Sequence, residues 1–241
     1  MKLKKNKKAD KTKAAALPKK THIYFVLDRS GSMASIADDV IGGFNKYVED
    51  QKAAGDDDLV LTLVQFDSQD PFEIIENATP IGEVKPLSRE VFVPRGATPL
   101  LDSEGKTIAL AKERAASLSK KDREAIVFVS YTDGMENASM EYTRDQIAKM
   151  KEELGKDGHA KSGPWNFVYL GANQDAYKGA AAVGNMQVRN VQTYQATSKG
   201  VSDSFDGLSA ASVRYRGDRA GGQTIASNAF LNTDDTDSTT E

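Results

Sequence analysis

Residues 23–33 read IYFVLDRSGSM, an apolar run that ends at Asp28 and continues with hydroxyls at alternate positions, Ser30 and Ser32. A strand that is apolar on both faces has to be covered on both faces, which is typical of the parallel sheet of an α/β protein. The carboxylate and hydroxyls at its end do nothing for such a core. They therefore mark the end of this strand as a candidate functional site.

The rest of the chain alternates strand-like and helix-like patterns, with amphipathic helices between apolar strands. This alternation predicts a doubly wound, mostly parallel central sheet with helices on both faces and one antiparallel edge strand. We expect strands over 22–28, 59–67, 125–132, 165–173 and 191–197, an edge strand over 71–77, and helices over 35–55, 100–118, 143–156 and 198–216.

Length and charge fit one domain with tails. The 241 residues carry a net charge of −3, which argues against a surface built for nucleic acid. Residues 1–20 are rich in lysine and 216–241 are acidic, and neither segment has the apolar residues that would offset the entropy of ordering it. We expect a domain over 21–215 between a basic disordered tail and an acidic flexible one, with nucleic acid held at most weakly through the lysine-rich tail.

The composition also indicates in which cellular compartment the protein is expected. The chain has no cysteine, so disulfides, thiolate nucleophiles and cysteine-based zinc sites are excluded. The N-terminal lysines are followed by no apolar stretch of signal-peptide length, and no window is apolar enough for a membrane span. These features lead us to expect a soluble, cytoplasmic protein with no membrane partner.

Two further loops place oxygen ligands where other strands and helices meet. Asp133, in SYTDGMEN, follows the strand over 125–132 as Asp28 follows its own strand, and Thr98, in PRGATPLLD, precedes a helix. In open α/β sheets, ligands bind at the carboxyl ends of the strands, where the strand order reverses. Two carboxylates and three hydroxyls suit a small hard cation such as Mg²⁺ or Mn²⁺, and Ca²⁺ is the next alternative.

These three motifs together, DRSGS, GATPL and TDG, resemble the von Willebrand factor type A (VWA) domain and its metal-ion-dependent adhesion site, over about residues 21–215. The stretch FVYLGANQDAYKGAAAVG resembles the later strand and helix of stand-alone bacterial or phage members. The resemblance implies a metal held by Ser30, Ser32 and Thr98, with Asp28 and Asp133 bonded directly or through water. It also implies an open coordination position for an Asp or Glu carboxylate from a partner protein.

Each motif also has an ordinary structural interpretation. Asp28 and Ser30 could form a turn and a helix N-cap, Thr98 could cap the helix that Pro99 begins, and Asp133 with Gly134 could form a simple turn. The tripeptide Arg216 to Asp218, RGD, resembles an adhesion signal, but Gly217 is placed where a helix C-cap is expected.

Catalysis finds little support in the sequence. A serine nucleophile needs a base, and the only histidines are His22, at the far end of the first strand, and His159, beyond a helix. The segment EGKT at 104–107 lacks the first glycine of a phosphate-binding loop. We therefore predict a metal-dependent protein-binding module. The alternatives are a scaffold or phage virion component with an idle metal site and, less favoured, a divalent-metal-dependent hydrolase.

Overall fold

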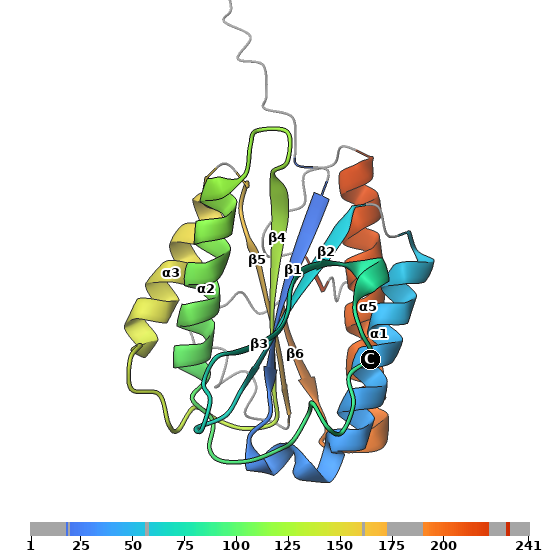
Figure 1. Cartoon of the computed structure of the whole chain (residues 1–241), viewed down its shortest axis with the longest axis vertical. Coiled ribbons are helices and arrows are strands. Elements are labelled where there is room, and N and C mark those ends of the chain that lie inside the picture. The colour runs from blue at the N-terminus through green and yellow to red at the C-terminus, as the bar shows by residue number, and fades with distance from the viewer. Residues whose placement is uncertain are drawn as a thin grey trace, which may run out of the picture.

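A six-stranded sheet in the order β3-β2-β1-β4-β5-β6 forms the centre of the molecule (Figure 1). The computed structural model describes residues 18, 20–55, 58–160, 162–172, 190–221 and 230–231. Only β3 is antiparallel to its neighbour. The strands are β1 (Lys20–Asp28), β2 (Leu59–Phe66), β3 (Glu73–Pro80), β4 (Glu124–Thr132), β5 (Asn166–Ala172) and β6 (Val191–Tyr194). The predicted fold class, including the antiparallel edge strand, is confirmed.

Helices cover both faces of the sheet, α1 and α5 on one side and α2 and α3 on the other (Figure 1). The helices are α1 (Ala37–Ala53), α2 (Leu100–Ser117), α3 (Arg144–Asp157) and α5 (Ser198–Ala220), with short 3₁₀ helices η1 (Gly31–Ile36) and η2 (Ile81–Glu83). None of the described helices is long and apolar enough to cross a membrane.

The two-sided cover explains why β1 is apolar at nearly every position. Phe25 and Leu27 face the layer of α1 and α5, whereas Tyr24 and Val26 face the layer of α2. Each face of the strand thus contributes to a separate buried cluster, and burial of this apolar surface is the main favourable contribution to folding. Trp165 is fully buried in the second cluster.

The strand order reverses beside β1. The chain passes from β1 to β2 on one side and then returns to β4 on the other, and all three strands are parallel. The carboxyl ends of β1, β2 and β4 therefore lie together at one edge, the lower edge in Figure 1. This is the edge at which the sequence places the candidate ligands.

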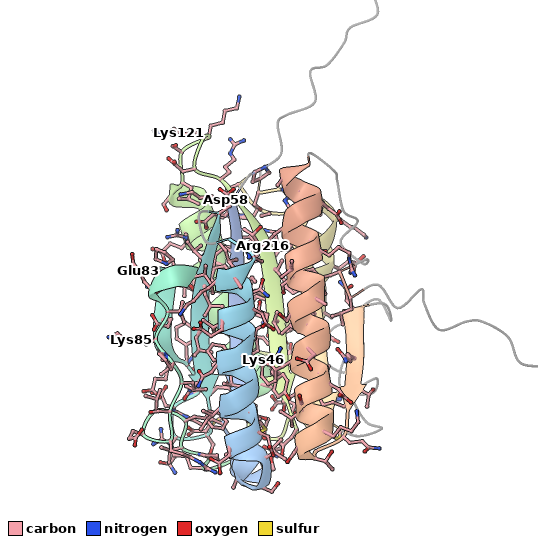
Figure 2. All side chains as sticks on the ribbon, turned by 90° about the vertical axis from the view of Figure 1, so that its right-hand side faces the viewer. Lys46, Asp58, Glu83, Lys85, Lys121 and Arg216 are labelled. Carbon is pink, nitrogen blue, oxygen red and sulfur yellow. The ribbon has the colours of Figure 1, made fainter. Side chains whose placement is uncertain are left out.

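Helices α1 and α5 lie side by side (Figure 2). Lys46 of α1 forms ion pairs with Asp50 of its own helix and with Asp206 of α5, at 2.9 and 3.0 Å. Arg216 of α5 donates from Nη1 to the backbone oxygen of Gln51 at 3.1 Å. The two helices are thus joined along their length as well as through the core.

Some predictions for the helix over 198–216 and for the tails need correction or fall outside the described residues. Helix α5 continues to Ala220 and not only to 216, and Gly217 lies inside the helix, whose C-cap is Gly221. Phe230, assigned to the flexible tail, is buried in the core. Residues 173–184, the later part of the stretch FVYLGANQDAYKGAAAVG, lie outside the described residues, as do almost all of 1–20 and all of 232–241.

Candidate metal centre

Asp28 is the last residue of β1 and is fully buried. Its Oδ1 accepts a hydrogen bond from the backbone N–H of Ser30 at 2.7 Å. This bond alone would fit the turn that the ordinary structural interpretation of Asp28 describes. Its Oδ2 accepts a second bond from the hydroxyl of Thr132 at 2.5 Å. Because Thr132 ends the neighbouring strand β4, the carboxylate is fixed from two strands and not by the turn alone.

A chain of short contacts joins the two serines to the second aspartate. The hydroxyls of Ser30 and Ser32 lie 3.1 Å apart, and Ser32 donates to Oδ1 of Asp133 at 2.6 Å. Ser30 is the N-cap of η1, but its side chain makes no capping bond. The hydroxyls therefore point into the space between the two carboxylates, with Ser32 exposed and Asp133 partly buried.

Thr98 reaches the same space from a third loop. A Cβ atom placed on Gly134 would lie 3.4 Å from the hydroxyl oxygen of Thr98 and 3.6 Å from that of Ser32. The backbone of Thr98 exchanges hydrogen bonds with Asn137, donating to its Oδ1 at 2.9 Å and accepting from its N–H at 3.2 Å. The structure thus brings together all five residues that the sequence singled out. The glycine leaves the space between two of them open.

The capping interpretation of Thr98 is not what the structure shows. The N-cap of α2 is Pro99, and it makes no side-chain capping bond. The first helical N–H groups are instead bonded from the loop between β4 and α3, that of Leu101 by the Glu136 carboxylate at 2.9 Å and that of Asp102 by the Ser139 hydroxyl at 3.1 Å. A carboxylate at a helix N-terminus also complements the helix dipole.

Burial raises the pKa values of both carboxylates of the site. Burial raises the pKa of Asp28 to about 6, although hydrogen bonds from Thr132 and Ser30 oppose the rise, and the charge of Asp133 adds to it. Burial also raises the pKa of Asp133, against the hydrogen bond from Ser32. Within the described part of the chain, neither carboxylate forms an ion pair with a lysine, arginine or histidine.

These residues fit a hard divalent cation. A buried carboxylate that lacks a positive partner is costly, and a cation is the group that would offset this cost. Three hydroxyls and two carboxylates supply only oxygen, the donor that Mg²⁺ and Mn²⁺ prefer. No group of three or more His, Cys, Asp or Glu side chains suited to a metal occurs among the described residues, so the hydroxyls are essential to the fit.

The sequence predicted no role in the site for three further residues. Thr132 holds Asp28, Gly134 leaves the space open and Asn137 holds the backbone of Thr98. Thr132 and Gly134 flank Asp133 in the sequence, so the strand-end position that singled out Asp133 could have drawn attention to both. Asn137 has no such signal, because only the folded loop brings it to Thr98.

The groups considered for catalysis lie elsewhere. His22, near the start of β1, is fully buried between Glu124 and the hydroxyl of Thr62, at 2.9 and 2.8 Å. His159 follows the end of α3, at the edge opposite Asp28. The segment over 104–107 lies within α2, so it forms no phosphate-binding loop.

No protein-family model and no curated protein matches the chain, but solved structures do. The PilB minor pilin from Streptococcus sanguinis matches with a TM-score of 0.58 at 14% identity, covering 84% of this chain and 63% of that protein. The vWF domain of the type V pili tip protein Mfa5 from Porphyromonas gingivalis matches with a TM-score of 0.53 at 11% identity, covering 88% and 98%.

A third structure, the manganese-loaded TRAP protein from Plasmodium vivax, matches with a TM-score of 0.53 at 13% identity, covering 73% of this chain and 69% of that protein. The chain spans less than half of two other matched proteins. At these identities the likeness concerns the fold. The chain has a fold like that of a von Willebrand factor type A domain.

Proposed function

We propose that the chain is a metal-dependent protein-binding module. Asp28, Ser30, Ser32, Thr98 and Asp133 would hold Mg²⁺ or Mn²⁺, directly or through water. The observation that carries this proposal is the fully buried carboxylate of Asp28, which forms no ion pair among the described residues and lies beside three hydroxyls and a second carboxylate. The match to a protein described as manganese-loaded supports the same assignment.

The chemistry of the ligand set indicates what the site would bind. Five oxygen donors would leave one position of an octahedral Mg²⁺ or Mn²⁺ for a further oxygen ligand, and three of the five, the hydroxyls, add no negative charge. Ser32 is exposed and Asp133 is partly buried, so this position faces solvent. A carboxylate from an Asp or Glu of a partner protein has the charge and geometry to complete the coordination.

We assign no catalytic role to the site. A hydrolase of this kind would need a base near the metal, and both histidines lie toward the opposite edge of the sheet. A minor pilin and a pilus tip protein are among the structural matches. These points support a binding role over the hydrolase alternative.

The first test is metal binding measured by isothermal titration calorimetry. We expect the wild type to bind Mn²⁺ and Mg²⁺ and Asp28→Asn to bind neither. Asp38→Asn is the matched control, because Asp38 lies in the first turn of α1 beyond the same loop, is largely exposed and pairs with Arg89. Equal metal affinity in the wild type and Asp28→Asn would overturn the assignment.

The second test concerns the partner. A pull-down from the source cell in Mg²⁺, repeated with EDTA, should yield a protein that is lost with the chelator, and substitution of one exposed Asp or Glu of that protein should abolish its binding. A partner retained equally in EDTA and by Asp28→Asn would instead favour a scaffold in which the metal site is idle.

A further inference from the structure

Thr98 lies near the end of a long connection without regular structure, from η2 to α2. Such a segment costs conformational entropy to hold in one place, and a metal ligand at its end is useful only if that place is fixed. Asn137 holds the backbone of Thr98 itself. The residues just before Thr98 are held by a different part of the chain, the turn after β2.

Ser68 is the direct contact between this turn and the segment before Thr98. Its hydroxyl accepts a hydrogen bond from the backbone N–H of Ala97 at 2.9 Å. Gly96 adopts a φ of +66°, and a Cβ atom there would lie 2.5 Å from the Ser68 hydroxyl oxygen. The segment therefore rests on Ser68 so closely that only glycine fits beside it.

Asp67 ties the same segment to the loop after β1. Its side chain is fully buried, and its Oδ2 accepts from Nε of Arg29 at 2.7 Å and from Nε of Arg95 at 2.9 Å. Its Oδ1 accepts from the N–H groups of Gln69 and Asp70, which sets the shape of the turn that carries Ser68.

Two backbone bonds complete the connection. The N–H of Arg95 donates to the carbonyl of Arg29 at 2.9 Å, and that of Gly31 donates to the carbonyl of Gly96 at 3.0 Å. The segment over 95–97 is thus joined to the loop that carries both site serines and to the turn after β2. Asp67 and Ser68 are not among the candidate ligands, yet their bonds to Arg29, Arg95 and Ala97 act on the loops that carry the candidate ligands.

We propose that Asp67 and Ser68 are positioning residues that hold the segment over 95–97 so that the Thr98 hydroxyl is in place before a metal binds. This inference rests on the proposed metal site. Groups that orient a metal ligand typically change metal affinity 10- to 100-fold when they are removed. A single neutral hydrogen bond belongs at the lower end of that range.

The test is a double-mutant cycle on Mn²⁺ affinity. We expect Ser68→Ala to weaken Mn²⁺ binding about ten-fold in the wild-type background. In a Thr98→Ala background it should have almost no further effect, because the Thr98 hydroxyl that Ser68 helps to position is no longer present. Ser119→Ala is the matched control: it removes another exposed serine hydroxyl, which donates to Asp122 at the opposite edge, and it should leave the affinity unchanged.

A second readout does not involve metal. In the metal-free protein, Ser68→Ala should speed amide hydrogen exchange at Ala97 and leave exchange in the core strand β4 unchanged, which separates local loosening from general instability. Failure of the wild type to bind Mn²⁺ would contradict the proposed function. Wild-type binding that Ser68→Ala leaves unchanged, or weakens equally with and without Thr98, would overturn this inference alone.

Discussion

Two buried carboxylates near opposite ends of neighbouring strands show how local partners set the charge of a residue. Asp28 has no positive partner in the described structure, and burial raises its pKa to about 6. Burial would also raise the pKa of Glu124, but hydrogen bonds from His22 and Arg114 lower it to about 2. The first group is suited to receive a cation, whereas the second already has its positive partner.

This difference predicts that the Asp28 carboxylate lowers the stability of the metal-free folded protein. We expect Asp28→Asn at pH 7.5 to leave the free energy of unfolding unchanged or to raise it by about 1–2 kcal/mol, because it removes a charge that burial disfavours. Denaturant unfolding in EDTA measures this change. A marked loss of stability would show that the carboxylate serves chiefly as a structural acceptor for Ser30 and Thr132.

Glu124 and His22 predict loss of stability in acid. The folded pKa of Glu124 is about 2, below its unfolded value, so its contribution is present above pH 4.5 and is lost as the pH falls toward 2. Burial lowers the pKa of His22, despite the opposing effect of Glu124, so below about pH 6.5 the unfolded chain takes up a proton that the folded one does not. Both effects destabilise the protein as the pH falls.

The matched pair of variants for this prediction lies in β4 and α2. Glu124→Gln should lower the free energy of unfolding at pH 7 by about 2 kcal/mol, and its stability should then depend less on pH below 4.5. Glu113→Gln, an exposed change on α2, should keep the wild-type profile. A pH profile of Glu124→Gln parallel to that of the wild type would contradict the assignment.

At the scale of elements, the packing of α1 on α5 depends on one of two adjacent glycines. A Cβ atom on Gly43 would lie 2.3 Å from the ring of Phe205, whereas one on Gly42 would meet nothing within 4 Å. We expect Gly43→Ala to destabilise by about 1–3 kcal/mol and Gly42→Ala to stabilise by about 0.5–1 kcal/mol. Denaturant unfolding of both variants measures the difference, and equal effects would contradict the close approach.

The elements that sequence predicted well are those with a complete local signal. The two-sided apolar run of β1 and its terminal Asp28 specified a buried parallel strand and a ligand edge. The start of α2 at residue 100 was also predicted, but the residues that bond its first N–H groups, Glu136 and Ser139, were not, because they are distant in sequence. The end of α5 was misplaced because Gly217, usually a stop signal, lies in a helix that Arg216 and Arg219 anchor through long-range bonds.

The residues of the candidate site also fall into those that the sequence predicts and those that it does not. Its five candidate ligands stand at strand ends and loop positions that sequence can recognise, and the fold brings them together. Asp67 and Ser68 also follow a strand, but their role depends on contacts with Arg95 and Ala97, which no local pattern predicts.

At the scale of the molecule, residue Phe230 extends the domain beyond the boundary that composition suggested. Its ring is buried 5.3 Å from that of Tyr215, its N–H donates to Asn190 at 3.0 Å, and its carbonyl accepts from Arg214 at 2.6 Å. We expect Phe230→Ala to destabilise by about 3 kcal/mol and Leu231→Ala, at a partly buried position, by less. Thermal unfolding compares the two variants. Equal stability of Phe230→Ala and the wild type would show that this segment contributes nothing to the folded domain, as expected of a tail.

The whole molecule should fold without metal. Its two buried clusters are assembled from strands and helices on both faces of the sheet, and neither contains a candidate ligand. Metal that binds only the folded state adds stability by mass action, about 2.7 kcal/mol at a concentration one hundred times Kd, but does not create the fold. We therefore expect EDTA to leave the circular dichroism spectrum unchanged, and Mg²⁺ to raise the melting temperature of the wild type but not of Asp28→Asn. Unfolding of the wild type by EDTA alone would show instead that the cation is part of the structure, as in a zinc finger, and that the site serves folding before it serves binding.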